Sequence, residues 1–407
     1  MKKAILASAL ILCSIFANAQ WQKTNSPNSG GVNCFANTGS HLFAGTDSVG
    51  TFLSTNNGDN WAVEASGLTN KSVKSVITIG GNAFAGTHGS GVFLSSDDGN
   101  SWTSKNKGLT NSNINTLMAI GTNIFAGTDA GVFISSDSGA NWSAINTGLS
   151  TIQVVALAIN GTQIFAGTYG GGAFVSSNSG DSWKAVNNGL PSDSISAFAI
   201  SGSNIYAGTN SSGVFLSTDN GSSWNVVSTG LTNSHIWALV PAGLRLFAAT
   251  GGGGKGKGTG GGNGQGKGKG GIFALNIGGN TWSSVNTGLP KTDVRSLYIV
   301  GSTMFAGTAD SNVWKRPVSE LTSGIADIKN DNSDLEIYPN PAINNIIIKY
   351  KTSSKTELVI YNVLGEMVFK NTLLPLQSDQ QMIDISAWQK GVYFLKIGDR
   401  TEKIIRN

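Results

Sequence analysis

The chain is poor in the residues that build most catalytic and metal centres. Its 407 residues include two cysteines and three histidines, and only 12% are Asp, Glu, Lys or Arg. Cys13 lies in the apolar N-terminal stretch, which would leave Cys34 as the single thiol after processing. One thiol excludes an intramolecular disulfide and a cysteine-based metal site, and the histidines lack zinc-ligand spacing. We therefore expect no metal, no cofactor and an inert, buried Cys34.

Long apolar runs and an excess of one charge sign are also missing. Residues 1–19 join Lys2 and Lys3 to an apolar run and end in small residues before Gln20, which predicts a signal peptide. No later run approaches the ~18 apolar residues of a membrane span. Without Lys2 and Lys3 the chain has 25 basic and 23 acidic residues, so its net charge gives no argument for nucleic acid. We expect an exported monomer without a transmembrane span.

Glycine, at 55 residues, and a repeated tetrapeptide are what the sequence has in abundance. "FAGT" begins at 43, 84, 125, 165 and 305, with "YAGT" at 206 and "FAAT" at 247. Six of these seven copies fall 40 or 41 residues apart, and the last follows after 58. Each unit contains four strand-length runs separated by Gly, Asn, Asp and Ser turns. An all-β, seven-bladed β-propeller over residues 20–318 is therefore predicted, with a β-solenoid as the structural alternative.

The two ends of the repeat predict how the ring closes. "WQKTNS" from Trp21 matches the segment "WAVEAS" (61–66) but is not preceded by an octet of the kind "SSDDGNSW" (95–102), whereas the last copy of "FAGT" is not followed by one. We therefore expect the N-terminal strand to complete the last blade.

An octet such as "SSDDGNSW" (95–102) recurs between the third and fourth strand of the unit. Its pattern Ser-x-Asp-x-Gly-x-x-Trp resembles the Asp-box, or BNR repeat, of sialidases, sortilin-type receptors, xyloglucan hydrolases and propeller-type assembly factors. The pattern is complete at Ser95, Asp97, Gly99, Trp102, Ser135, Asp137, Gly139, Trp142, Ser217, Asp219, Gly221 and Trp224.

The octet is interpreted as a structural element. Short Ser and Asp side chains can bond to backbone N–H groups in a turn, and Gly supplies a positive φ. A catalytic acid is needed once, yet the octet occurs five times and carries Asn at Asn56 and Asn178. Calcium binding would also suffer from the loss of a carboxylate.

The resemblance to Asp-box proteins implies that a ligand would bind on the face opposite the octets, which we call the upper face. This face carries the loops after "FAGT" and the loops after the Gly-Leu turn that ends a unit, as at Gly108 and Leu109. The first loop residue after each "FAGT" varies while its framework repeats, as expected of a binding site on a scaffold. A second variable position falls on the innermost strand. The candidates for ligand binding from the two positions are Asp47, His88, Asp129, Tyr169, Asn210, Lys74, Trp237 and Arg295.

These residue types leave three functions open. Polar groups beside Tyr169 and Trp237 favour a non-catalytic binding protein for polysaccharide or another surface ligand. A glycoside hydrolase would use Asp47 and Asp129 as its two carboxylates, which stand ~6.5–9.5 Å apart in inverting enzymes. A protein-interaction or assembly propeller is the third hypothesis. Ordinary loop-tip polarity, with Trp237 in the core, would need no ligand.

The 58-residue spacing comes from an insertion at 251–271, which contains 14 Gly and the four cations Lys255, Lys257, Lys267 and Lys269. Its composition predicts a flexible, cationic loop on the upper face. It is either a tether for acidic polysaccharide or lipopolysaccharide, or a low-complexity expansion without a function.

After a polar linker at 319–334, residues 335–407 change in texture to alternating runs such as "NIIIKY" and "VYFLKI", which predict a small Ig-like antiparallel β-sandwich. "YPNP", "NVLGEMV", "GVYFLKI" and the basic "KII" resemble the type A C-terminal sorting domain of the type IX secretion system. The resemblance implies the secretion machinery as partner and a secreted or outer-membrane-surface location. The residues that carry the signal are Tyr338, Pro339, Asn340, Pro341, Gly365, Gly391 and Lys403.

Overall fold

The computed structural model describes residues 20–27, 29–39, 41–191, 193–252, 270–322, 335–338, 340, 342–350, 356–362, 366–373, 380–397 and 400–406. The chain divides into two compact units, Met1–Thr322 and Ser323–Asn407. The predicted signal peptide, most of the 251–271 insertion and most of the linker lie outside the described residues.

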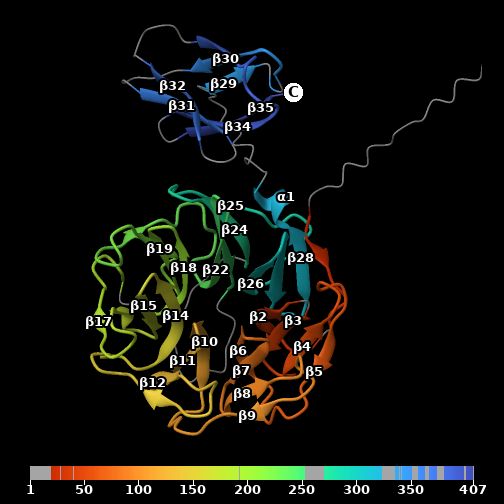
Figure 1. Cartoon of the computed structure of the whole chain (residues 1–407), viewed down its shortest axis with the longest axis vertical. Coiled ribbons are helices and arrows are strands. Elements are labelled where there is room, and N and C mark those ends of the chain that lie inside the picture. The colour runs from red at the N-terminus through yellow and green to blue at the C-terminus, as the bar shows by residue number, and fades with distance from the viewer. Residues whose placement is uncertain are drawn as a thin grey trace, which may run out of the picture. The chain divides into compact units, whose positions relative to one another are not determined.

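The first unit is a β-propeller of seven four-stranded antiparallel sheets arranged around a central axis (Figure 1). The predicted fold class and blade number are confirmed. Each blade runs outward from an innermost strand. Blade 1 is β2 (Val32–Thr38), β3 (His41–Thr46), β4 (Thr51–Ser54) and β5 (Ala62–Glu64); blade 2 is β6 (Val73–Ile79), β7 (Asn82–Thr87), β8 (Gly91–Ser95) and β9 (Thr103–Ser104).

Blades 3 to 6 repeat this order. They are β10 (Ile114–Ile120), β11 (Asn123–Thr128), β12 (Gly131–Ser135) and β13 (Ser143–Ala144); β14 (Val154–Asn160), β15 (Gln163–Thr168), β16 (Gly172–Ser176) and β17 (Lys184–Ala185); β18 (Ile195–Ser201), β19 (Asn204–Thr209), β20 (Val214–Ser217) and β21 (Asn225–Val226); β22 (Ile236–Ala242), β23 (Arg245–Thr250), β24 (Gly271–Asn276) and β25 (Trp282–Ser284).

Blade 7 joins the two ends of the repeat, as the sequence predicts. It consists of β26 (Val294–Val300), β27 (Thr303–Thr308), β28 (Val313–Pro317) and the N-terminal β1 (Gln22–Lys23). β1 pairs antiparallel with β28, and the Trp21 indole N–H donates to the carbonyl of Val285 over 2.9 Å. The helix α1 (Val318–Thr322) follows β28 directly. The ring is thus closed by main-chain hydrogen bonds between segments nearly 300 residues apart.

The "FAGT" tetrapeptide packs one blade against the next. Its aromatic residue is buried in all seven copies, and in the first copy Phe43 is 0% exposed. A Cβ atom at Gly45 would lie 2.7 Å from Cγ1 of Val73, which begins the innermost strand of blade 2. A Cβ there would force a shift, and Gly86, Gly127, Gly167, Gly208 and Gly307 meet the next blade in the same way, whereas blade 6 has the buried Ala249 at this position.

The threonine of the tetrapeptide fixes the root of each upper-face loop. Thr87 is fully buried and its hydroxyl donates to the carbonyl of Gly91, at the start of the next strand, over 2.8 Å. All seven blades make this bond, at 2.8–3.2 Å. In blade 6 it joins Thr250 to Gly271 across the insertion.

The octet fastens the turn between the third and fourth strands. In blade 3 the Ser135 hydroxyl donates to Asp137 Oδ1 (2.8 Å) and accepts from the N–H of Gly139 (2.9 Å). Asp137 Oδ1 also accepts from the N–H of Asn141 (2.9 Å). Asn178 uses its Oδ1 for the equivalent bonds with Ser176 (2.8 Å) and Ser182 (3.0 Å). The turn needs one acceptor oxygen, which explains why Asn serves as well as Asp.

The octet tryptophan links its blade to the one before. Trp142 donates from its indole N–H to the carbonyl of Lys105 (2.8 Å) and from its backbone N–H to the carbonyl of Lys107 (2.9 Å). Two tryptophans differ: the Trp61 indole N–H donates to the carbonyl of Gly58 in its own octet (3.1 Å), and the buried Trp102 indole N–H has no partner among the described residues. The carbonyl equivalent to that of Lys105 belongs to Glu64, and it accepts the Thr51 hydroxyl instead.

The second unit contains two antiparallel sheets of order β29-β30-β33 and β32-β31-β34-β35. Its core includes Ile346, Ile348, Leu358, Ile360 and Leu395, all 0% exposed. The strands are β29 (Leu335–Tyr338), β30 (Asn345–Tyr350), β31 (Thr356–Asn362), β32 (Met367–Leu373), β33 (Gln380–Asp384), β34 (Gly391–Ile397) and β35 (Arg400–Arg406).

The octet carboxylates give the propeller a defined acid sensitivity. Hydrogen bonds from Asn141 and Ser135 lower the pKa of Asp137 to about 2, and those from Ser223 and Ser217 do the same for Asp219. A depressed folded-state pKa stabilises the fold above the unfolded pKa, and this contribution disappears as pH falls through the folded value. We expect the Asp137→Asn/Asp219→Asn variant to lose less thermal stability than the wild type between pH 4 and 2, measured by circular dichroism.

Asp181→Asn is the matched control, because Asp181 is an exposed octet residue whose carboxylate accepts no hydrogen bond found among the described residues. It should follow the wild-type pH profile. Asp137→Ala should unfold at lower temperature than Asp137→Asn at pH 7, since Ala removes the acceptor. Equal melting of the Ala and Asn variants would contradict this role of the octet.

Candidate functional site

Each innermost strand of the propeller has a β-bulge at the second variable position. The register shifts between Val32 and Cys34 in blade 1 and between Val73 and Ser75 in blade 2, and equivalent shifts occur in the other five blades. A bulge leaves one residue unpaired and redirects its side chain. The seven bulged residues are Asn33, Lys74, Asn115, Val155, Ser196, Trp237 and Arg295.

The first residue after each "FAGT" lies next to the bulge of its own blade. The backbone N–H of His88 donates to the carbonyl of Ser72 (2.9 Å), which precedes the innermost strand. Asp47, Tyr169, Asn210, Gly251 and Ala309 make the same bond to Gly31, Gln153, Ser194, His235 and Asp293. The two variable positions therefore form one continuous upper rim around the axis.

The structure brings Asp47 and Arg295 together across the joint between blades 7 and 1. Their charged groups form an ion pair of 2.8 Å, with side chains 34% and 25% exposed. Arg295 Nη1 also lies 3.5 Å from Asn33 Oδ1. A Cβ at Gly31 would stand 3.0 Å from the Arg295 guanidinium carbon, so the glycine leaves room for this side chain.

Trp237 lies at the rim of blade 6 and is 39% exposed, so it is not a core residue. The guanidinium carbon of Arg295 stands 6.0 Å from the centre of the Trp237 ring, within cation–π range. The His235 ring packs against the Trp237 ring, with 4.6 Å between the ring centres and a tilt of 45°. A Cβ at Gly251 would lie 2.9 Å from Trp237 Cδ1, which explains glycine at this rim position.

Asp129 occupies a separate part of the rim, where three amides hold its carboxylate. Asn113 and Asn115 of its own blade donate over 2.8 and 2.9 Å, and Gln153 of blade 4 donates over 3.1 Å. The arrangement fixes the carboxylate in place and surrounds it with hydrogen-bond donors. These hydrogen bonds link blades 3 and 4.

The remaining predicted site residues are more loosely placed. Lys74 is half-buried on the bulge of blade 2, and burial followed by repulsion from Arg295 lowers the pKa of its ammonium. His88 is exposed, Tyr169 is 43% exposed and Asn210 is half-buried. These three belong to blades 2, 4 and 5 and are not joined to the Asp47–Arg295 pair by any side-chain bond found in the described residues.

Sequence reasoning missed the residue just before each innermost strand. Asn113, Gln153, His235 and Asp293 all hold this position, and each contacts a predicted site residue or the loop beside it. Asp293 accepts the N–H of Gly252, at the root of the insertion, over 2.8 Å. Variation one residue before an invariably buried Val or Ile was the available signal.

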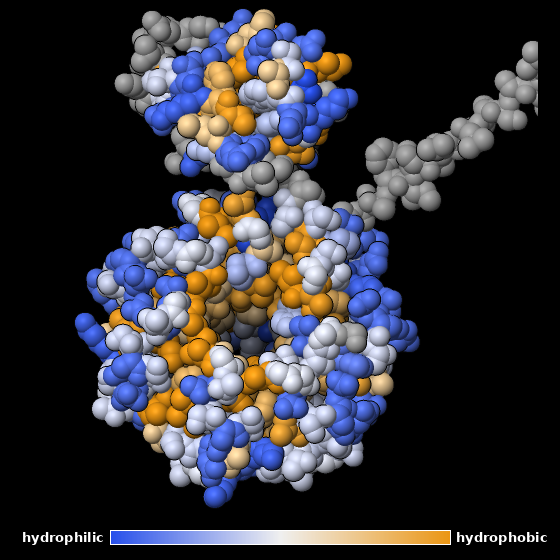
Figure 2. Space-filling view, viewed as in Figure 1, coloured by the Kyte–Doolittle hydropathy of each residue, from blue (hydrophilic) through white to orange (hydrophobic). Residues whose placement is uncertain are grey.

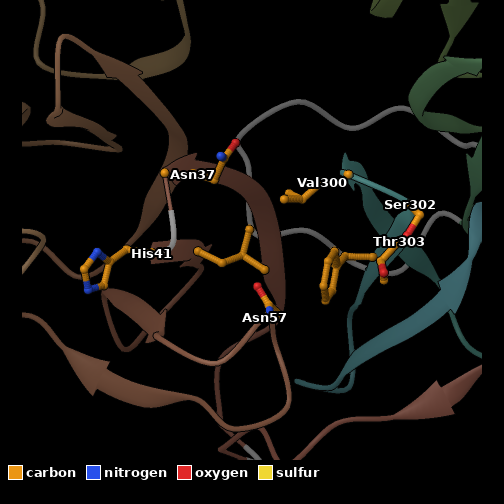
Figure 3. Close-up of a pocket in the computed structure, with 10 residues that line it drawn as sticks. Asn37, His41, Asn57, Val300, Ser302 and Thr303 are labelled. Carbon is orange, nitrogen blue, oxygen red and sulfur yellow. The ribbon is translucent and has the colours of Figure 1, made fainter.

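A cavity of about 300 Å³ opens on the opposite face, between blades 7 and 1 (Figure 3). At two other joints this turn bonds to the octet of the next blade, through Asn160 Nδ2 to Asn220 Oδ1 (3.1 Å) and through the Thr38 hydroxyl to Asp98 Oδ1 (3.5 Å). Val300 is apolar, as are Ile79 and Ile120 at the same place in blades 2 and 3, and no such bond reaches Asn57 among the described residues. The cavity lies on the octet face, away from the variable rim.

Cys34 takes no part in the site. It packs against Gly45, and burial raises the pKa of its thiol to about 12. Among the described residues no cluster of three His, Cys, Asp or Glu side chains could hold a metal ion. The same residues contain no helix long and apolar enough to cross a membrane.

In the second unit, the Asn340 side chain ties the "YPNP" segment to the C-terminal strand. Its Nδ2 donates to the carbonyl of Lys403 (2.6 Å), and its Oδ1 accepts the N–H of Ile405 (2.8 Å). Gly391 begins β34 and pairs with Arg406 of β35. Pro339, Pro341, Gly365 and the Tyr338 side chain lie outside the described residues.

Comparison with known families agrees with the two units. Residues 64–207 match the DUF6242 β-propeller domain, and residues 336–407 match the secretion system C-terminal sorting domain. No curated protein matches the chain.

Among solved structures, the chain is similar to YCF48 bound to D1 peptide, with 15% identity and a TM-score of 0.58 over 73% of this chain and 96% of that one. YCF48 from Cyanidioschyzon merolae gives 15% and 0.56 over 74% and 99%. The GH74 xyloglucanase from Xanthomonas campestris gives 13% and 0.56 over 82% of this chain but only 59% of the enzyme. At these identities the likeness concerns the fold alone.

The matched sorting domain assigns the export route, and the matched propeller and its structural neighbours assign the fold of the larger unit. The chain therefore consists of a β-propeller followed by a type IX secretion system sorting domain, and that domain assigns export to the cell surface or secretion.

Proposed function

We propose that the propeller is a non-catalytic binding protein for polysaccharide at the cell surface, and that the upper rim is its binding site. The observation that carries the proposal is the set of seven bulges, each of which turns a variable side chain into the rim. The scaffold around them repeats almost without change, so the sequence variation is concentrated at the positions where a ligand would bind. The signal peptide at 1–19 and the octets as Asp-boxes belong to the same proposal.

The chemistry of the rim suits a sugar chain. Trp237 and Tyr169 are the two large aromatic side chains of the rim, and both expose a substantial part of their surface, 39% and 43%. An exposed aromatic face provides an apolar platform, while amides and charged groups around it supply hydrogen bonds. Figure 2 shows a hollow at the centre of the ring on the face in view.

The hydrolase alternative finds less support in the rim. Asp47 is engaged by Arg295 at 2.8 Å, and Asp129 accepts three amide donors. An inverting glycosidase needs one carboxyl group that donates a proton and one that activates water. Both carboxylates are surrounded by hydrogen-bond donors rather than by apolar side chains.

Substitution of the rim aromatics tests the binding site. Trp237→Ala and Tyr169→Ala should each weaken binding to a recognised polysaccharide by about tenfold, equivalent to about 1.4 kcal/mol, because each removes an aromatic contact. Affinity gel electrophoresis against a panel of plant and algal polysaccharides measures the effect, with reducing-sugar release assayed in parallel.

Leu244→Ala and Val226→Ala are the controls, since these side chains are 74% and 63% exposed but lie away from the rim. Both should bind like the wild type. Release of reducing sugar that is lost in Asp47→Asn or Asp129→Asn would replace the binding proposal by the hydrolase. Failure of the wild type to bind any member of the panel would reject polysaccharide as the ligand class.

Export provides a separate test of the second unit. A chain that ends at Asp334 should remain inside the cell envelope as a folded propeller, because the sorting domain at 336–407 is missing. Immunoblots of medium, surface and periplasmic fractions measure the distribution. The propeller's thermal unfolding should match that of the full chain, since the two units have separate cores.

A further inference from the structure

We propose that Lys74 and Arg295 form an anion-binding site in the upper rim, and that its ligand is the carboxylate of a uronic acid unit in an acidic polysaccharide. The inference rests on the proposed binding function and adds the charge and chemical class of the ligand. It concerns one sector of the rim, formed by the bulges of blades 7, 1 and 2.

Three consecutive bulges build this sector. Arg295, Asn33 and Lys74 are the bulged residues of blades 7, 1 and 2, so they follow one another around the axis. Asn33 connects them: its Oδ1 lies 3.5 Å from Arg295 Nη1, and its Nδ2 donates to the carbonyl of Val73 (2.9 Å), next to Lys74. The Asn33 side-chain amide therefore lies between the arginine and the backbone beside the lysine.

The sector contains one more positive charge than its neighbours balance. Asp47 is the acid in reach, and its Oδ2 is already bonded to Arg295 at 2.8 Å. The half-buried Lys74 ammonium has no hydrogen bond or ion pair with any residue that the structure describes. A partly buried lysine without a partner is unfavourable, and an anion from outside would supply what is missing.

The charges around Lys74 support this balance. Burial lowers the pKa of Lys74, Arg295 lowers it further, and Asp47 opposes both. Cys34 also lies near Lys74, but it is a neutral thiol at physiological pH because burial raises its pKa to about 12. The aspartate thus compensates one of the two cations and leaves the other.

The surroundings favour a sugar carboxylate over a bare inorganic anion. Trp237 stacks near the Arg295 guanidinium, 6.0 Å from ring centre to guanidinium carbon, and exposes 39% of its surface. A planar guanidinium binds carboxylates through two parallel bonds, and a lysine adds a point charge. A uronic acid carries a carboxylate on the same ring that can lie on the aromatic face.

The experiment measures binding of the exported protein to oligogalacturonate and to the same oligosaccharide after carboxyl reduction, by isothermal titration calorimetry at two salt concentrations. The wild type should prefer the acidic form by tenfold or more, and the preference should shrink at high salt. Lys74→Met should lose most of this preference. Lys74→Arg should restore it.

Lys71→Met is the matched control. Lys71 is an exposed lysine three residues before Lys74, so the variant removes the same charge from the same blade without touching the bulge. Its affinity for oligogalacturonate should stay within twofold of the wild type. Lys74→Met should also melt at the same temperature as the wild type or higher, because it removes an unpartnered, partly buried charge.

The outcomes separate this proposal from the broader one. Equal binding of the acidic and reduced oligosaccharides, with loss in Trp237→Ala, would overturn the anion site and leave polysaccharide binding standing. Equal losses in Lys71→Met and Lys74→Met would reduce the effect to overall charge and also overturn it. Binding of a peptide with a free C-terminal carboxylate, but of no oligosaccharide, would reject both the uronate and the polysaccharide.

Discussion

The propeller depends on the close approach between each "FAGT" glycine and the first buried residue of the next innermost strand. At Gly45 and Val73 the two blades are so close that a methyl group at position 45 would collide. This spacing sets the angle between blades at six of the seven joints, and blade 6 has Ala249 in place of the glycine. The FAGT phenylalanines and octet tryptophans then fill the space that opens toward the outside. The blades pack mainly through apolar contacts, and the hydrogen bonds of the octet fix the turn between the third and fourth strands.

The bulges follow from the same constraint. An innermost strand must pack its Val or Ile against the preceding glycine, yet it must also end at a rim that faces solvent. One extra residue per strand separates these tasks, because the bulged side chain is released from the packing register. Asn33, Asn115 and Ser196 use this freedom to donate to the first carbonyl of the next innermost strand. Lys74, Trp237 and Arg295 make no such bond, and they are the side chains that the proposal assigns to a ligand.

Much of the fold could be predicted because the repeated motifs mark the same strands in every blade. The positions of "FAGT" and of the octet defined the blade count, and the unmatched Trp21 segment predicted the closing strand. The interior of the site was less accessible to sequence reasoning. Asp47 and Arg295 are separated by 248 positions along the chain, and nothing local to either residue announces their ion pair. The positions of variation could be listed from the repeat, but the bulge that gives them a common direction is a property of backbone pairing.

The threonine at the root of each upper-face loop has a consequence for how this surface can change. Its hydroxyl closes the loop at the last paired residues, so the strands beneath end in the same way whatever lies between. In blade 6 the bond from Thr250 to Gly271 spans 21 positions, whereas most blades bridge four or fewer. Because the entropy of closing a loop grows only slowly with its length, the propeller can accept new segments at seven equivalent places with little effect on its core. The upper face is therefore open to diversification, one loop at a time, on a frame that does not have to be rebuilt.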